Sequence, residues 1–370
     1  MTAARLLVAV GDAEAAGTWS GIPHHLLAAG RRSGFLQGGL GLEPGRLRLD
    51  RAAWNAWRLL RSGRPGGYQY SPRFLRRLWA GGAAAAAGAE LLSHFPLLPP
   101  PGAGGRVSFY IDATLRQNFD DYGLGERVHP ELRDDALRRE REQYARAERV
   151  VCMSRWAAAS VVRDYGVPAS KVFVVRAGAN LDEAALSRLP PPPPPERDVL
   201  RLGFVGKDWR RKGLPFLLEV ADAIAARRQA VEVIAVGPSA AELPPHPLLR
   251  PLGFLDKRGG LAHFVAAISS AHFGCLFSSA EALGISTLEF LRLGIPVAGF
   301  EVGGISDCIT ADVGLLLRAG TGAADVAGAL LDAFAPGRYE AFRAAARAHA
   351  TEVTWDRAVA ELEAIWGAPR

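Results

Sequence analysis

The sequence predicts an α/β protein with two doubly wound domains, each built on a parallel sheet. Apolar runs of strand length alternate with segments of helical composition through most of the chain. A run of six prolines at residues 190–195 separates two halves that both show this alternation. The length of 370 residues also exceeds what one core usually supports. A cleft between the two domains is expected to follow.

The predicted division has four parts. Residues 1–185 form a Rossmann-like N-terminal domain, and 186–199 form a stiff proline-rich linker. Residues 200–350 form a second Rossmann-like domain, and 351–370 contain a last helix.

Composition describes a soluble globular protein, with 49% hydrophobic and 22% charged residues. The first apolar run, residues 6–10, is followed by Asp12 and Glu14, which argues against a signal peptide or a membrane span. The three cysteines lie far apart, without metal spacing or a disulfide framework. We therefore expect a cytoplasmic protein without a metal site.

The positive charge does not predict a nucleic-acid partner. The net charge of +6 and the isoelectric point near 9.5 are mild for this length and are carried almost wholly by arginine. Lysine occurs only at positions 171, 207, 212 and 257. The position of Lys207 and Lys212 within one short loop is therefore notable.

The first strand is expected at residues 6–10 and the first helix at 24–32. Between them, Gly21 permits close approach of a ligand to the backbone, and Pro23 fits a first helical turn. A ligand-binding loop that includes Ser20 and Gly21, and a plain strand-to-helix turn, both remain open.

Residues 51–88 contain no acidic side chain. Arginines alternate there with aromatic residues: Arg51, Arg58, Arg61, Arg64, Arg73, Arg76 and Arg77 with Trp54, Trp57, Phe74 and Trp79. One interpretation is peripheral contact with the inner face of a membrane, or with an anionic acceptor, through Arg51–Arg77. The other, which we favour, is a solvated arginine face over a buried Trp/Leu face.

A second strand, residues 107–111, ends at Asp112. In α/β folds ligands lie at the carboxyl ends of strands, so Asp112 either binds hydroxyls of a ligand or caps the next segment.

The charged segment 133–149 predicts a solvent-facing helix. A strand at 150–154, a helix at 155–165 and a strand at 172–175 follow.

In the second half, a strand at 200–205 leads through a basic loop to a helix at 214–227. Lys207 and Lys212 in this loop suit neutralisation of a diphosphate next to a helix N-terminus, although basic residues in turns are often only exposed. Lysine lacks the guanidinium fork, so Arg210 or Arg211 is a candidate to share the task. Further elements are expected at 232–236, 261–270, 298–305 and 313–316.

The central motif is a strand at 273–279, a loop and a helix at 286–293. The first turn of such a helix leaves N–H groups unpaired and carries a positive dipole, which suits a phosphate. Glu281 and Glu289 flank this turn, and Gly284 lets a ligand come close. A nucleotide sugar, with a diphosphate between two polyhydroxy rings, fits this pattern, although exposed glutamates are common on helices.

Three features of the chain resemble the retaining glycosyltransferases of the GT-B fold, family four. They are the two glutamates with seven residues between them, the Gly-Ile-Pro-Val exit at 294–297 and the segment SRWAAASVVRDYGVPASKVFVVRAGAN. That family usually has arginine and lysine where this chain has Lys207 and Lys212. The resemblance implies that Glu281 contacts the transferred sugar and Glu289 the ribose. It implies contacts of the diphosphate with Gly284, Ile285, Ser286 and Thr287, of the base with Phe254 and Leu255, and of the donor with the Gly21 loop.

The resemblance also implies that the first domain binds the acceptor and that the last helix, 355–366, crosses back to pack on it. Family members often have a histidine near the sugar where this chain has Asp112. The expected activity is metal-independent hexosyl transfer with retention of configuration, from a nucleoside-diphosphate sugar to a carbohydrate, lipid-linked or small-molecule acceptor. Glu281, Lys212, Lys207 and Asp112 are the candidate catalytic residues, and no cofactor is expected. A non-catalytic nucleotide-sugar-binding subunit and another GT-B enzyme, such as a sugar-nucleotide epimerase, remain alternatives.

Overall fold

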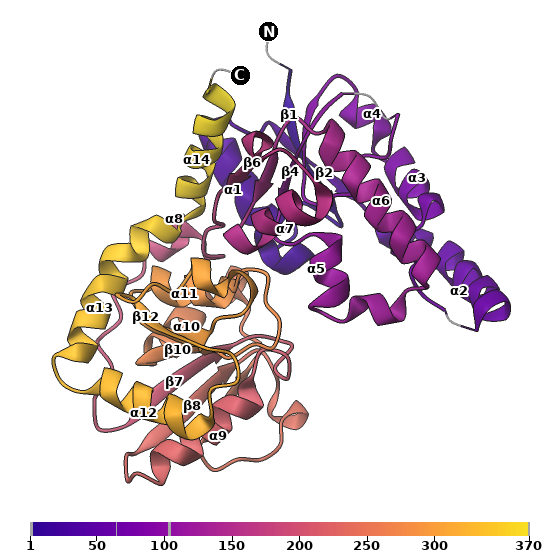
Figure 1. The fold of residues 1–370 in the computed structure, drawn as a ribbon. Coiled ribbons are helices and arrows are strands. Elements are labelled where there is room, and N and C mark those ends of the chain that lie inside the picture. The colour runs from indigo at the N-terminus through magenta and orange to yellow at the C-terminus, as the bar shows by residue number, and fades with distance from the viewer. Residues whose placement is uncertain (1–2, 64, 103–104, 369–370) are drawn as a thin grey trace. The chain divides into compact units, whose positions relative to one another are not determined.

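The computed structural model describes residues 3–63, 65–102 and 105–368, and it consists of two compact units, each with one six-stranded sheet (Figure 1). The first unit contains the chain up to Arg176 and again from Ala358, and the second contains Ala177–Arg357. The predicted α/β class with two doubly wound sheets is confirmed. The proline-rich segment 186–199, expected between domains, lies within the second unit.

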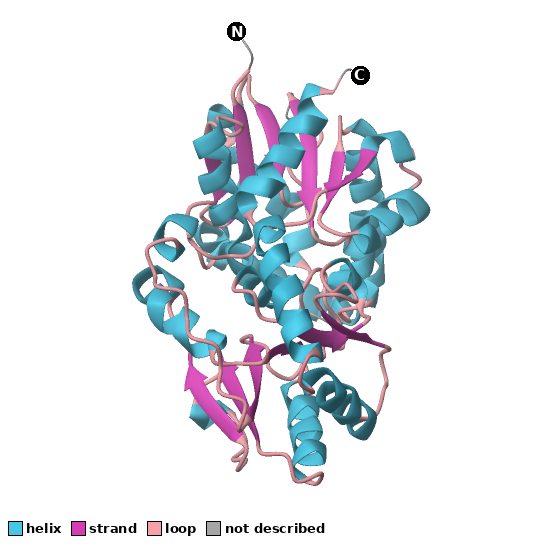
Figure 2. Ribbon diagram, turned by 90° about the vertical axis from the view of Figure 1, so that its left-hand side faces the viewer, coloured by secondary structure: helices cyan, strands magenta, loops and turns pink. Residues whose placement is uncertain are grey.

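The first sheet has the strand order β2-β1-β3-β4-β5-β6, and all neighbouring strands are parallel. Helices cover both faces of this sheet (Figure 2). Its strands are β1 (Arg5–Val10), β2 (Gly38–Leu42), β3 (Glu90–Ser93), β4 (Arg106–Ile111), β5 (Val150–Cys152) and β6 (Val172–Val174). Its helices are α1 (Ile22–Ser33), α2 (Arg48–Ser62), α3 (Pro72–Ala80), α4 (Ala83–Ala86), α5 (Leu115–Asp120), α6 (Pro130–Arg146) and α7 (Arg155–Tyr165).

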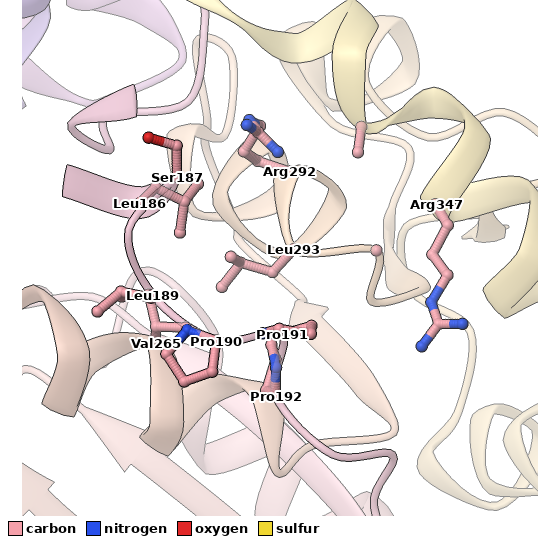
Figure 3. Close-up of a pocket in the computed structure, with 12 residues that line it drawn as sticks. Leu186, Ser187, Leu189, Pro190, Pro191, Pro192, Val265, Arg292, Leu293 and Arg347 are labelled. Atoms are coloured by element: carbon pink, nitrogen blue, oxygen red, sulfur yellow. The ribbon is translucent and has the colours of Figure 1, made fainter. Parts of the chain in front are cut away.

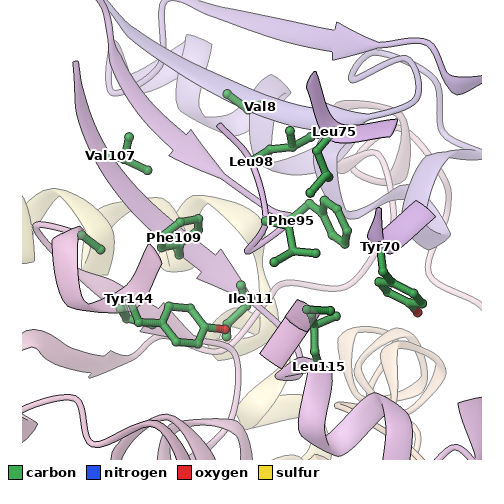
Figure 4. Packing of buried hydrophobic residues seen from close by; sticks show 14 of the residues in the cluster. Val8, Tyr70, Leu75, Phe95, Leu98, Val107, Phe109, Ile111, Leu115 and Tyr144 are labelled. Carbon is green, nitrogen blue, oxygen red and sulfur yellow. The ribbon is translucent and has the colours of Figure 1, made fainter. Parts of the chain in front are cut away.

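The sequence did not predict β2 and β3. The β2 sequence, GGLGL, has weak intrinsic strand propensity, yet it pairs with β1 because Leu40 and Leu42 face the core. Its glycines also let α1 approach, since a Cβ at Gly39 would lie 2.7 Å from the Leu27 side chain. The core of this unit is built largely from β4 and the residues around it, including Phe109, Ile111 and Tyr144 (Figure 4).

Helix α6 differs from its prediction as a solvent-facing helix. One of its faces is buried, and this face is largely polar: Arg139, Glu140, Gln143 and Tyr144 are all at most 8% exposed. Glu140 accepts hydrogen bonds from the Leu115 amide and from two tyrosine hydroxyls. A buried polar face gives no apolar periodicity, so the sequence pattern could not reveal it.

The second sheet has the order β12-β11-β10-β7-β8-β9, again entirely parallel. Its strands are β7 (Leu200–Val205), β8 (Val231–Val236), β9 (Leu249–Gly253), β10 (Phe273–Leu276), β11 (Val297–Phe300) and β12 (Gly314–Leu317). Its helices are α8 (Glu183–Leu186), α9 (Leu214–Ala225), α10 (Lys257–Ser269), α11 (Ile285–Arg292), α12 (Ala323–Phe334) and α13 (Arg338–His349).

The last helix, α14 (Trp355–Gly367), starts in the second unit and ends in the first, as the resemblance implied. Trp355 donates from Nε1 to Asn180 Oδ1 at 2.8 Å within the second unit. Trp366 donates from Nε1 to Glu90 Oε1 at 2.7 Å and packs edge-on against Phe35 in the first. A single helix is therefore anchored by one tryptophan in each unit.

Candidate functional site

The strand order of the second sheet places a crevice between β7 and β10. From β7 the chain continues outward to β8 and β9, and it then returns to the other side of β7 to form β10. The loops after β7 and β10 therefore leave the sheet toward opposite faces, which opens a ligand site at the carboxyl ends of these strands. The predicted lysine loop follows β7, and the loop with Glu281 follows β10.

These two loops are joined through their backbones. The amide of Ser279 donates to the carbonyl of Arg211 at 2.9 Å. Gly213, which precedes α9, has a φ of 80°, and a Cβ there would lie 2.2 Å from the Phe277 carbonyl oxygen. Only glycine fits this position, because the contact atom is backbone and φ is positive. The relative position of the loops is therefore fixed before any ligand binds.

Lys212 and Glu281 form an ion pair across this junction. Nζ of Lys212 lies 2.8 Å from Oε2 of Glu281, and Arg211 Nη1 lies 3.4 Å from the same oxygen. The two paired side chains are mostly buried, at 16% and 11% exposure. Burial alone raises the pKa of the Glu281 carboxyl, but Lys212 and Arg211 more than offset this, so its pKa is lowered. Glu281 is therefore an ionised carboxylate.

The backbone also holds both members of the pair. A Cβ on Gly206, directly after β7, would lie 2.3 Å from Cδ of Lys212, so the lysine stem occupies the space that a larger residue would need. On the other side, the Gly304 amide donates to the Glu281 carbonyl at 3.2 Å. A Cβ at Gly303 would lie 1.8 Å from that carbonyl oxygen. The backbone of Glu281 is thus packed against Gly303 and Gly304 in the loop after β11.

The N-terminus of α11 has the features expected of an anion site. Its N-cap is Gly284, with φ 88° and ψ 58°, and no side chain caps the first turn. Ser286 and Thr287, in that turn, are 7% and 2% exposed. The unpaired N–H groups and the dipole of the helix together favour a negatively charged group here.

Glu289 is not an exposed helix glutamate, because it is only 1% exposed. Its Oε1 pairs with Nζ of Lys257, the first residue of α10. Nζ of Lys257 also lies 4.7 Å from the centre of the Phe264 ring. The sequence offered no role for Lys257. A signal was present, since it is one of few lysines and lies shortly after Phe254 and Leu255.

Lys207 and Phe254 lie together on the loops after β7 and β9. Nζ of Lys207 lies 4.7 Å from the centre of the Phe254 ring, which is 63% exposed. Leu255 beside it is partly buried. Of the two candidate arginines, Arg211 reaches Glu281, whereas the Arg210 guanidinium stacks 4.0 Å from the Trp209 ring. Arg210 therefore does not join the cluster around Glu281.

In the first unit, the strand order changes direction between β1 and β3. The loop after β1 contains Gly21, the N-cap of α1 with φ 90°, preceded by Trp19 and Ser20 with φ of 46° and 58°. Successive non-glycine residues in the left-handed region are strained, and such strain is concentrated at functional sites. The conformation of the Ser20–Gly21 segment is compatible with the ligand-binding loop, which stays a prediction.

The loop after β3 begins with His94, a residue that the sequence analysis missed. His94 is 3% exposed, its Nδ1 lies 2.9 Å from the Tyr110 carbonyl, and its ring meets Trp19 edge-on at 5.1 Å. Because a carbonyl only accepts, Nδ1 carries the proton and Nε2 of the neutral ring carries a lone pair. Among the described residues, Nε2 has no hydrogen-bond partner. Prediction of β3 would have placed His94 at a strand end.

Asp112 follows β4, one strand away from the direction change of the first sheet. It does not cap the next helix, which was one of its two interpretations. Thr114 is the N-cap of α5, and it forms a capping box with Gln117. The partly buried Asp112 remains a candidate ligand-binding residue, in the first unit, whereas Glu281 and the lysines lie in the second.

Two pockets lie apart from the Glu281 cluster. One, of about 280 Å³, lies between the proline segment and Arg292 and Arg347, and Figure 3 shows it without any predicted site residue. The other, of about 530 Å³, lies in the first unit and is lined by Trp19, Tyr68, Tyr70, Phe74 and Phe95 among others.

Within the described chain, no cluster of three or more His, Cys, Asp or Glu side chains could hold a metal, and no helix could span a membrane.

Comparisons with known proteins show which family and fold the chain resembles. Residues 200–335 match the family described as glycosyl transferases group 1. The chain is 32% identical over 235 residues to a D-inositol 3-phosphate glycosyltransferase of Kribbella flavida, covering 57% of this chain and 54% of that protein. A protein of the same name from Geodermatophilus obscurus is 29% identical, with 66% and 57% covered. The chain thus spans about half the length of these curated relatives.

Two solved structures share the fold along nearly the whole chain. A sucrose-phosphate synthase from Thermosynechococcus elongatus aligns with a TM-score of 0.72 at 17% identity, covering 99% of this chain and 98% of the other. HepE from Anabaena, in complex with UDP and glucose, aligns with a TM-score of 0.64 at 14% identity, covering 98% and 100%. The protein is therefore of the GT-B fold. Its segment 200–335 matches the glycosyl transferases group 1 family, which confirms the resemblance seen in the sequence.

Proposed function

We propose that this protein is a retaining glycosyltransferase that moves a hexose from a nucleoside-diphosphate sugar to an acceptor hydroxyl. The observation that carries the proposal is the buried Lys212–Glu281 pair at the β7/β10 crevice, next to the uncapped N-terminus of α11. A cation, an ionised carboxylate and a helix dipole together match a diphosphate that bears a sugar with hydroxyl groups.

The diphosphate is proposed to bind between the lysine loop and α11. An ammonium group has three donors, so Lys212 can keep its bond to Glu281 and still donate to phosphate oxygens. Lys207 and the amides of Gly284, Ile285, Ser286 and Thr287 complete the proposed anion site. Glu281, held by Lys212, accepts hydrogen bonds from hydroxyls of the transferred sugar.

The nucleoside is proposed to lie on the side of Glu289 and β9. Glu289 accepts from ribose hydroxyls, and Lys257 fixes the direction of its carboxylate. The exposed ring of Phe254, together with Leu255, offers an apolar surface for the base. The identity of the base is left open by these contacts, since a ring face stacks on any base.

The proposed reaction proceeds on one face of the sugar. The acceptor oxygen attacks the anomeric carbon while the bond from that carbon to the diphosphate oxygen breaks. The acceptor proton moves to the departing phosphate, so no enzyme nucleophile is needed. Lys207, Lys212 and the α11 N-terminus stabilise the charge that develops on the leaving diphosphate, and in this proposal they do so without a metal ion.

We assign acceptor binding to the first unit, at its aromatic pocket of about 530 Å³. Stacked rings suit the apolar faces of a carbohydrate or the body of a lipid-linked or small-molecule acceptor. His94 and Asp112 are proposed to contact hydroxyls, because Nε2 of His94 carries an unpartnered lone pair. The curated relatives are named for D-inositol 3-phosphate, which makes a phosphorylated polyol the first acceptor to test.

The proposal is tested by measuring nucleoside diphosphate release from a panel of UDP-, GDP- and ADP-sugars, with inositol phosphate among the acceptors. A donor that is consumed identifies the base, and NMR of the product shows whether the anomeric configuration is retained. The same assay with a chelator tests independence of metal ions.

The decisive variant is Glu281→Gln, which keeps the size of the side chain and removes its charge. We expect activity to fall by about 10²-fold or more, because a carboxylate that contacts the sugar acts in the transition state. Glu219→Gln, on the exposed face of α9, is the matched control. Undiminished turnover of the Glu281 variant would exclude the role assigned to Glu281. If the wild-type protein binds a donor but turns over none of the donors tested, a non-catalytic binding subunit is favoured.

A further inference from the structure

The outer face of helix α2 is apolar. Leu49 and Leu60 are 87% and 90% exposed, and the alanines between them, Ala53 and Ala56, are also exposed. The spacing of these residues, 49, 53, 56 and 60, places them along one side of an α-helix. Surface helices normally turn such a stripe toward the core, so α2 is oriented the opposite way.

The inner face of α2 combines buried polar groups with Trp54, which packs against the core. Arg58 is only 9% exposed, and the side chain of Asp50 is 8% exposed. Asp50 accepts a hydrogen bond from Nε of Arg73 at 3.1 Å and also pairs with Arg77, both on α3. The single acidic group of α2 is therefore neutralised by α3.

The outer surface of α2 is left with unbalanced positive charge. Arg48 and Arg61, one on each side of the stripe, are exposed, and among the described residues neither has an acidic partner. Arg51 lies on the same side of the helix as the buried Arg58, and both Arg48 and Arg51 line the pocket of about 530 Å³. Trp57, 47% exposed, lies beside the stripe, with the Arg61 guanidinium 5.7 Å from its ring. Leu59, 53% exposed, borders the other side. Arg64 lies outside the described residues.

The interpretation favoured from the sequence, a solvated arginine face over buried Trp and Leu, therefore holds for only one of the two helices. In α3, Phe74, Leu75, Leu78 and Trp79 are buried, and its arginines point outward or to Asp50. In α2, the leucines point outward and Arg58 points inward. Both helices combine arginine, leucine and tryptophan, so these residue types alone do not reveal which face of each helix is buried.

We propose that α2 docks this protein on the surface of an anionic lipid bilayer. Leucine and tryptophan would enter the headgroup region, and the arginines beside them would meet lipid phosphates. The helix has 15 residues and is about 22 Å long, so it lies along a surface and does not span it. Figure 1 shows α2 at the periphery of the first unit, away from the sheet.

Charge favours a bilayer over a second copy of the chain. Two copies meeting through α2 would bring their arginines together without acidic groups to balance them. A single convex helix also offers no groove for an inserted peptide, whereas a lipid surface deforms around it. The docking surface belongs to the first unit and needs no turnover, so its test is independent of the proposed transferase activity.

The test is co-sedimentation of the full chain with vesicles of phosphatidylcholine alone or with about 30% phosphatidylglycerol, at low and high salt. We expect binding to the anionic vesicles only, and weaker binding at high salt because exposed charges are screened. The double variant Leu49→Ser/Leu60→Ser should reduce partitioning by about tenfold or more, because two apolar anchors are lost. A variant Arg48→Gln/Arg61→Gln should weaken the salt-sensitive part of vesicle binding.

Matched controls use exposed residues elsewhere. Val162→Ser on α7, at 39% exposure, and Arg250→Gln/Arg318→Gln in the second unit should leave binding unchanged. Equal binding of wild type and the leucine variant, or no binding of wild type to anionic vesicles, overturns the proposal. So does a wild-type dimer that the leucine variant converts to a monomer in light scattering while vesicle binding persists.

Discussion

Nζ of Lys212 lies 2.8 Å from Oε2 of Glu281, and this contact connects the loop after β7 with the loop after β10. The pair is mostly buried, so each charge depends on the other for its stability. It holds a carboxylate in ionised form and directs an ammonium group toward the crevice without a ligand. The candidate site is thus preorganised by one ion pair.

Removal of the cation should change the titration of the carboxylate. In Lys212→Met the burial of Glu281 is no longer offset by Lys212, so the pKa of Glu281 should rise. We expect the acid limb of the kcat/KM profile to move to higher pH, together with at least about a tenfold loss at neutral pH. Lys171→Met, which removes a half-buried lysine of the first unit, should change neither. An unshifted acid limb would show that Lys212 does not control the ionisation of Glu281.

Glu289 should depend on Lys257 for stability. Lys257→Met leaves a carboxylate that is almost fully buried without its cation, which is strongly unfavourable. Because Lys257 is itself about a third exposed, we expect a loss of about 1–3 kcal/mol in urea unfolding. The double variant Lys257→Met/Glu289→Gln should regain part of this loss. If the single variant is as stable as wild type, the pair is not a buried ion pair in solution.

His272 should make the second unit acid-sensitive. The ring is fully buried, its Nδ1 accepts from the Arg201 amide at 3.0 Å, and burial, with the nearby Arg201 and Arg197, lowers its pKa to about 4. The unfolded chain binds this proton at higher pH than the folded one, so stability falls as pH drops from about 6.5 to 4. The full loss is about 3 kcal/mol.

The measurement is urea unfolding at pH 7 and pH 4.5. In His272→Asn, whose Oδ1 can accept from the Arg201 amide, the decrease between the two pH values should be smaller by most of this amount. His263→Asn, at an exposed position of α10, should behave as wild type. Identical pH dependence in the His272 variant would disprove the contribution.

Glu140 should act with the opposite sign in the first unit. Burial raises its pKa to about 7, although hydrogen bonds from Tyr165, the Leu115 amide and Tyr144 favour the charged form. The folded chain therefore keeps a proton between pH 4.5 and 7 that the unfolded chain has lost, and stability falls as pH rises through this window. Glu140→Gln should gain stability relative to wild type, by up to about 3 kcal/mol, between pH 5 and pH 8.

The comparison of pH 5 with pH 8 serves as the internal reference for this variant. Any cost of fitting an amide among three hydrogen-bond donors is present at both pH values and cancels in the difference. Glu142→Gln, on the exposed face of α6, should show no such change. A constant difference between wild type and Glu140→Gln would mean that Glu140 is ionised at both pH values.

Most strands of the second unit, together with α9 and α11, follow closely from the sequence, because continuous apolar runs between turn residues are typical of buried parallel strands. The sequence did not predict α8, β9, α12 and α13. β7 lies at Leu200–Val205, as predicted, and α11 begins one residue earlier than expected. The first unit was harder to predict, since β2 is rich in glycine and β3 begins with a buried glutamate. Both strands form because neighbouring strands supply their hydrogen bonds, and such partners are distant in the sequence.

The sequence by itself determined the fold class, the loops that carry Lys207, Lys212 and Glu281, and the position of α11, whose N-terminus is the candidate anion site. These features are local, since periodicity, turn residues and helix starts depend on neighbours along the chain. Only the tertiary structure decided which cation meets which carboxylate, that His94 lies at a strand end beside Trp19, and that α2 turns its leucines outward. Ion pairs, burial and helix orientation depend on residues that are distant in the sequence and close in space. A pattern along the chain does not contain the distances in space between such residues.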